Sequence, residues 1–165
     1  MTDGAPAVSI IIPTLGLRER AQSLQVAIES ALGQSGVCPV VIVVLNGAGR
    51  SPEVERTLRD NRRIRLLIRE SRGLPAALAA GRAMVETEWF TALDDDDWLL
   101  PGALALRVRA LEQRRDCAAV VTNGYRRTGD RDELHVHAGN RVAIDPLRAL
   151  LDQNWCLPGS WMCRC

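Results

Sequence analysis

The sequence predicts an α/β fold in which a mainly parallel, twisted sheet is covered by helices on both faces. Short apolar runs rich in β-branched residues recur along the chain, and stretches with helical spacing of apolar residues lie between them. Turn residues such as Pro13, Asn46-Gly47 and Gly73 separate these segments. Helices that connect consecutive parallel strands are typical of the doubly wound class.

The first unit of this pattern is a strand followed by a helix. Residues 8–12 predict the strand, because this β-branched run ends at Pro13. Apolar residues then recur three or four positions apart from Leu17 to Leu32, which predicts the helix. Residues 40–45 predict a second strand, which ends at Asn46-Gly47.

The alternation continues through the middle of the chain. Ser51-Pro52 predicts a helix start, because proline suits the first helical position and acidic residues follow in the first turn. Residues 64–68 predict a third strand, and the Ala-rich stretch 75–85 predicts a helix of high intrinsic propensity. Residues 88–93 predict a fourth strand.

A further helix and strand are expected after the aspartate run. Pro101 opens a helix that carries Leu104, Val108 and Leu111 on one face. Residues 118–125 predict a fifth strand.

Beyond residue 125 the pattern changes. A polar turn at residues 128–132 joins two extended pieces, and the alternation at 134–137 suits a half-exposed strand of an antiparallel hairpin. Asp145 before Pro146 predicts a helix start. Residues 1–165 contain no linker or repeat, and we expect them to form one domain.

The composition excludes several classes of protein. The chain is 47% hydrophobic and 25% charged with a net charge of +1, and its arginines are scattered, so a nucleic-acid partner is not expected. No apolar run reaches the roughly 18 residues of a membrane helix, and no signal peptide is evident, which predicts a cytoplasmic protein without a transmembrane segment. A homo-oligomer is compatible with this composition. The five cysteines are expected to be reduced thiols.

The sharpest chemical feature is the run Asp94-Asp95-Asp96-Asp97, which directly follows the predicted strand at 88–93. Ligands of open α/β sheets bind at the carboxyl ends of the strands. Adjacent carboxylates in a crevice either take up protons or recruit a cation, and hard oxygen ligands favour Mg²⁺ or Mn²⁺ completed by substrate phosphates. The alternative is a solvated acidic loop that caps the next helix through its dipole.

Two other strand ends are expected at the same edge. Pro13-Thr14 follows the first strand and Asn46 the second, and they offer small polar groups for a base and a ribose, although each is also a common turn residue. Arg72-Gly73 leads into a helix whose N-terminus favours a phosphate, and the arginine adds a charge-assisted hydrogen bond.

Together these segments resemble family 2 glycosyltransferases, which are inverting enzymes of the GT-A fold, a Rossmann-like sheet. The matching segments are VSIIIPT at 8–14, VIVVLNG at 41–47, RGLPAALAAG at 72–81, and LDDDDW at 93–98 with Pro101 three positions later. The last is similar to the D-x-D-D signature of the family. The resemblance is good from Val8 to Leu111, and beyond it Pro158-Gly159-Ser160 resembles part of the acceptor-side region.

The resemblance assigns roles position by position. Asp94 and Asp96 match the two outer carboxylates of the metal motif, with Asp96 as the first choice of direct ligand to Mg²⁺ or Mn²⁺. Asp94 and Asp95 match residues that also touch the ribose. Pro13 and Thr14 match the loop around the nucleotide, and Asn46 stands where many members have an aspartate that contacts the base.

The chain also departs from the family pattern. Leu78 and Ala79 stand where members often carry Arg and Asn, so one contact to the diphosphate is absent. In similar enzymes the general base lies downstream of the acceptor-side strand, whereas this sequence ends at Cys165, which suggests a domain that is truncated or short on its acceptor side. Asp145 and Asp152 have no spacing that supports a catalytic role, and the catalytic residues therefore stay unassigned.

The resemblance implies transfer of a sugar from a nucleotide-diphosphate sugar to an acceptor hydroxyl, with inversion and a divalent cation. One alternative is a catalytically incomplete module that binds a nucleotide sugar or a partner, because no general base is evident. A nucleotidyltransferase is less well supported, since residues 13–20 lack the Gly-rich basic loop expected after the first strand.

Overall fold

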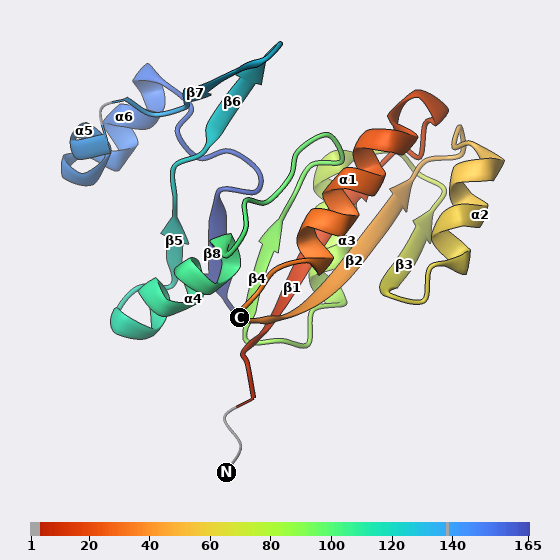
Figure 1. Cartoon of the computed structure of the whole chain (residues 1–165), viewed down its shortest axis with the longest axis horizontal. Coiled ribbons are helices and arrows are strands. Elements are labelled where there is room, and N and C mark those ends of the chain that lie inside the picture. The colour runs from red at the N-terminus through yellow and green to blue at the C-terminus, as the bar shows by residue number, and fades with distance from the viewer. Residues whose placement is uncertain (1–3, 138) are drawn as a thin grey trace.

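Six strands form one sheet in the computed structural model, which describes residues 4–137 and 139–165. They are β1 (Ala7–Thr14), β2 (Cys38–Asn46), β3 (Ile64–Arg69), β4 (Trp89–Ala92), β5 (Ala119–Val121) and β8 (Trp161–Arg164). Their order in the sheet is β3-β2-β1-β4-β8-β5 (Figure 1). The pairs β1–β2, β2–β3 and β1–β4 are parallel, as expected from the sequence, whereas β8 runs antiparallel to both of its neighbours.

Helices connect these strands. They are a 3₁₀ turn η1 (Arg18–Arg20), then α1 (Ala21–Leu32), α2 (Pro52–Asp60), α3 (Leu74–Ala83), α4 (Ala103–Gln113), α5 (Gly139–Ile144) and α6 (Pro146–Asp152). The four helices predicted between Leu17 and residue 113 are all present, as α1 to α4. The first begins four residues later than its apolar spacing suggested, because residues 18–20 form the 3₁₀ turn η1. Among the described residues, no helix combines the length and the apolar character needed to cross a lipid bilayer.

The apolar core lies on both faces of the sheet, which confirms the predicted arrangement of helices. On one face, α1, α2 and α4 contribute the larger cluster, and Ile10 and Ile12 of β1 point into it. On the other face α3 packs Ala77 against Ile11 and the second strand. The alternation of neighbouring isoleucines between the two clusters follows from the two-residue period of a strand.

Helix α3 approaches the sheet closely at Gly81. A β-carbon built there would lie 2.5 Å from Ile11 Cγ2 and 3.1 Å from Val44 Cγ2, which is closer than packed carbons come. Glycine is therefore required here for space rather than for an unusual backbone angle. This contact holds α3, and with it the loop at its N-terminus, against β1 and β2.

The segment after β5 differs from the prediction of one strand over 118–125. The chain leaves the sheet after Val121 and starts a separate hairpin of β6 (Tyr125–Thr128) and β7 (Arg131–Leu134), which confirms the predicted polar turn. The half-exposed strand predicted over residues 134–137 is wrong, because β7 ends at Leu134 and is exposed along its whole length. Asn123 causes the break, because its Oδ1 accepts hydrogen bonds from the backbone N–H groups of Gly124 (2.9 Å) and Val136 (3.0 Å). Figure 1 shows this hairpin with α5 and α6 on the side of β5 and β8, away from α1–α3.

The predicted helix start at Asp145 is also confirmed. Asp145 is the N-cap of α6, and its Oδ1 accepts a hydrogen bond of 3.0 Å from the backbone N–H of Arg148. This carboxylate therefore has a structural role at the end of the helix.

Candidate functional site at the carboxyl edge of the sheet

The loops after β1 and β4 meet at the carboxyl edge of the sheet. Thr14 is 4% exposed and its hydroxyl donates a hydrogen bond of 2.6 Å to Asp95 Oδ2, although the residues lie 81 positions apart in sequence. The Thr14 oxygen in turn accepts a bond of 3.0 Å from the Gly16 N–H. Pro13, one residue earlier, is buried within β1 opposite Val44. The start of the β1 loop therefore fixes one of the four carboxylates.

The four aspartates form a tight turn in which their charges lie close together. The backbone N–H of Asp97 bonds to the Asp94 carbonyl at 3.2 Å. Partial burial raises the pKa of the Asp94 carboxyl, and the neighbouring carboxylates of Asp97, Asp96 and Asp95 raise it further. The pKa of Asp97 is also raised, first by burial and then by Asp96. The negative charges of this loop are therefore not balanced by positive groups within the loop, and such an excess of negative charge favours binding of a cation.

Arg20 supplies the positive charge that the sequence did not point to. One terminal nitrogen of its guanidinium lies 2.8 Å from Asp95 Oδ1 and 2.5 Å from Asp96 Oδ2. The residue ends η1, so it reaches the acidic loop from the turn that follows β1. The only sequence signal was its place in that turn, at the same sheet edge as the aspartates, and the many other arginines masked it.

Asn46 is buried and binds the neighbouring loop. In the amide orientation that satisfies both of its ends, Nδ2 donates to the Ser71 carbonyl (2.7 Å) and Oδ1 accepts from the Gly73 N–H (3.2 Å). Asn46 thereby ties the end of β2 to the loop before α3. Contact of this side chain with a nucleobase stays a prediction, and it requires these two bonds to be shared or exchanged.

Arg72 projects from the loop that Asn46 holds. It is exposed and, within residues 4–137 and 139–165, forms no ion pair. Its stem lies over Gly47, where an added β-carbon would come within 3.1 Å of Arg72 Cγ. Gly73 has a φ of 149°, which other residues rarely adopt, and leads directly into α3. The guanidinium is thus free to bind an anion near the helix N-terminus.

The segment that resembles the acceptor-side region lies beside the acidic loop. The Gly159 N–H donates a hydrogen bond of 2.7 Å to the carbonyl of Ala92, the last residue of β4. Trp161 packs against Phe90 in an edge-to-face contact with ring centroids 5.6 Å apart, and its carbonyl accepts a bond from the Thr91 hydroxyl. Trp161 is therefore a packed residue that anchors this segment on β4.

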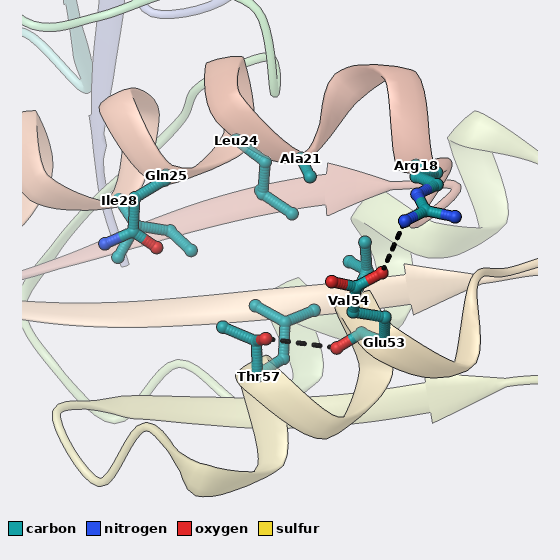
Figure 2. Close-up of a pocket in the computed structure, with 9 residues that line it drawn as sticks. Arg18, Ala21, Leu24, Gln25, Ile28, Glu53, Val54 and Thr57 are labelled. Carbon is teal, nitrogen blue, oxygen red and sulfur yellow. Dashed lines mark hydrogen bonds and ion pairs between the residues drawn. The ribbon is translucent and has the colours of Figure 1, made fainter.

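A separate hollow lies between α1 and α2, and Figure 2 shows its lining. Its volume is about 240 Å³, and Leu24, Ile28 and Val54 are among the residues around it. An ion pair of 3.3 Å between Arg18 and Glu53 crosses one end. None of the four aspartates lines this hollow, so it is distinct from the carboxylate cluster.

The raised pKa of Asp94 predicts that Asp94→Asn stabilises the metal-free protein at neutral pH. The folded state binds the Asp94 proton more tightly than the unfolded state does. This proton binding stabilises the fold fully below the ordinary pKa of an aspartate, and the stabilisation is lost as the pH rises through the higher pKa of the folded state. We expect a melting temperature about 2 °C higher for the variant at pH 7, because solvent screens this half-buried group, and little difference at pH 3.5.

Asp116→Asn is the matched control, with the opposite sign. Arg114 holds the pKa of Asp116 below its ordinary value through a hydrogen-bonded ion pair of 2.9 Å. That variant should be slightly less stable than the wild type at pH 7, and its difference should also shrink as the pH falls through the folded pKa. A metal-free Asp94→Asn protein that melts below the wild type at pH 7 would contradict the predicted repulsion.

Comparison with known proteins identifies the family of this chain. The sequence profile of glycosyl transferase family 2 matches residues 9–162. The chain belongs to this family. An uncharacterized glycosyltransferase of Rickettsia bellii is 31% identical over 121 residues, which are 73% of this chain and 17% of the relative. The succinoglycan biosynthesis protein ExoO of Rhizobium meliloti is 31% identical over 117 residues, which are 70% of this chain and 32% of that protein.

A solved structure supports the fold. The crystal structure of Staphylococcus aureus TarS 1-349 superposes with a TM-score of 0.55 at 15% identity, over 70% of this family 2 chain and 34% of that chain. The predicted GT-A-like fold class is thereby confirmed. The chain spans about a sixth to a third of the length of the relatives named above.

Proposed function

We propose that this family 2 member binds a nucleotide-diphosphate sugar at the carboxyl edge of β1, β2 and β4, and transfers the sugar to an acceptor hydroxyl with inversion. The observation that carries this proposal is the convergence of Asp95 and Asp96, from the loop after β4, with Thr14 and Arg20 from the loop after β1. The loops after two strands thus bring a hydroxyl, two carboxylates and a guanidinium together where open α/β sheets bind nucleotides.

The carboxylates present fit a divalent cation such as Mg²⁺ or Mn²⁺. Asp95 and Asp96 each direct one oxygen at a single positively charged nitrogen of Arg20, so two hard oxygen ligands already face one cation position. The described residues contain no group of three acidic, His or Cys side chains that suits a metal. A site with one or two carboxylates matches an ion that is also bound by substrate phosphates. We propose Asp96 as the direct ligand, with Asp95 facing the same position. Asp94, which the resemblance assigns as the second ligand, lies in the same turn, and its contact with the ion stays a prediction.

Each remaining loop has a proposed part in donor binding. Pro13 and Thr14 shape the wall beside the nucleotide, and Asn46 holds the loop from which Arg72 reaches toward the diphosphate. Gly73 leaves the N-terminus of α3 open to the same phosphates. When bound, the cation supplies the positive charge that stabilises the leaving diphosphate.

One observation favours the alternative of a module that only binds its ligand. In the described part of the chain, the two carboxylates available beyond the hairpin already have structural partners, since Asp145 caps α6 and Asp152 pairs with Arg141 at 3.0 Å. Neither is therefore proposed as the general base that transfer to an acceptor requires. Turnover distinguishes the enzyme from the binding module.

The test is release of nucleoside diphosphate from a panel of UDP-, GDP-, CDP- and dTDP-sugars, with Mn²⁺ present and water as the default acceptor. We expect slow hydrolysis of at least one donor by the wild type and none by Asp96→Ala. Asp130→Ala, which removes one exposed aspartate on the hairpin, is the matched control and should hydrolyse the donor like the wild type. Saturable donor binding without turnover of any sugar would reject the enzyme in favour of the binding module.

A further inference from the structure

Arg20 partly neutralises the acidic loop. Among the described residues, the ion pairs formed by the run Asp94–Asp97 are those of Asp95 and Asp96 with Arg20. The cationic side chain of Arg127, from the hairpin, lies over the Trp98 ring at 5.0 Å and pairs with Asp132. The charge balance of the loop therefore depends on a residue of the β1 turn.

The position of the Arg20 nitrogen conflicts with that of a bound cation. The same nitrogen lies 2.8 Å from Asp95 Oδ1 and 2.5 Å from Asp96 Oδ2, so it fills the space between the two oxygens. A divalent ion that binds oxygens at about 2.0–2.6 Å needs the same space. The guanidinium and the ion exclude one another from this position, both by volume and by charge.

The backbone around Arg20 is fixed, whereas its side chain can move. The Arg20 N–H bonds to the Leu17 carbonyl at 3.1 Å, and its carbonyl accepts from the Ser23 hydroxyl at 3.0 Å. The side chain is 38% exposed. Asp95, in contrast, stays bound through its other oxygen to Thr14. Asp95 is therefore held in place when Arg20 is absent, whereas the partly exposed Arg20 side chain can exchange with another cation.

We propose that Arg20 is a built-in counter-ion, which holds the cation position between Asp95 and Asp96 until a divalent ion arrives with a nucleoside diphosphate. This inference rests on the proposed function of the site. A free ion must displace Arg20 with few protein ligands to replace its water, so it binds weakly by itself. The diphosphate supplies further oxygen ligands and an anionic partner for the released guanidinium, so ion and nucleotide promote one another's binding.

Binding of Mn²⁺ alone tests the proposal, with free Mn²⁺ measured by electron paramagnetic resonance. Arg20→Gln should bind Mn²⁺ about tenfold more tightly than the wild type, because a unit charge a few ångströms from the ion is removed. Arg18→Gln is the matched control. It removes the same charge from the same 3₁₀ turn, but Arg18 pairs with Glu53 at 3.3 Å, so its Mn²⁺ affinity should stay within about twofold. Arg20→Lys keeps the charge and should stay close to the wild type.

The same titrations with UDP or GDP present separate the two proposals. In Arg20→Gln, the factor by which nucleotide increases Mn²⁺ affinity should fall by a similar tenfold. If the wild type binds Mn²⁺ with nucleotide but Arg20→Gln binds Mn²⁺ alone no more tightly, the counter-ion is rejected while the donor site stands. Absence of Mn²⁺ binding in every variant, with and without these nucleotides, would overturn the donor site and the counter-ion together.

Discussion

Asp96→Ala is expected to lower the affinity for a nucleoside diphosphate in the presence of Mn²⁺ by about 100-fold or more. The side chain of Asp96 is 57% exposed and directs an oxygen at the cation position, so its loss removes a proposed ligand without opening the core. Substitution of residues that only hydrogen-bond to metal ligands lowers metal affinity by about 10- to 100-fold, and loss of a direct ligand should lower it at least as much.

Isothermal calorimetry with UDP and GDP, in Mn²⁺ and in EDTA, measures this loss. The melting temperature of metal-free Asp96→Ala should change little, because the substitution removes an exposed ion pair with Arg20 but also relieves repulsion within the acidic turn. Asp130→Ala, which removes an exposed aspartate between β6 and β7, should keep wild-type affinity. Unchanged Mn²⁺-dependent affinity in Asp96→Ala would remove this residue from the site.

Gly81→Val is expected to lower the free energy of unfolding by about 3 kcal/mol or more, because it overpacks the contact between α3 and the sheet. The first added carbon alone would lie 2.5 Å from Ile11 Cγ2, and both Ile11 and Val44 are buried. For a chain of this length the melting temperature should fall by about 6 °C or more.

Gly49→Val is the control, because it makes the same glycine-to-valine substitution at a position with open space. Gly49 lies in an exposed loop, and a β-carbon there meets no atom within 4 Å. Chemical unfolding followed by circular dichroism should show a small change for this variant and a large one for Gly81→Val. If the two variants lose equal stability, α3 does not approach the sheet as closely as described.

Local patterns in the sequence account for the parallel part of the fold. Runs such as residues 40–45 are apolar on both faces, and a buried parallel strand requires this property, so β1 to β4 were predicted within a few residues. The antiparallel strand β8 was missed. Its four residues carry no alternation of their own, and their place between β4 and β5 depends on contacts with strands forty or more positions earlier.

The candidate site was predictable in location but not in its internal contacts. Parallel strands end at one edge, so Thr14 and the aspartates were expected to lie near one another, and Thr14 indeed bonds to Asp95. The bonds of Asn46 to Ser71 and Gly73 depend on the conformation of a loop that has no sequence signature. Arg20 was missed for a similar reason, since a long flexible side chain selects its partner only in the folded structure.

Nuclear magnetic resonance can locate Mn²⁺ on the protein and so show whether the ion binds at the acidic loop. Paramagnetic broadening of backbone amides, with Mn²⁺ added in small steps to the protein saturated with nucleoside diphosphate, reports distance from the ion. We predict that signals of Thr14, Arg20 and Asp94–Asp97 disappear first, while those of α6 persist. Broadening centred away from the carboxyl ends of β1 and β4 would contradict it.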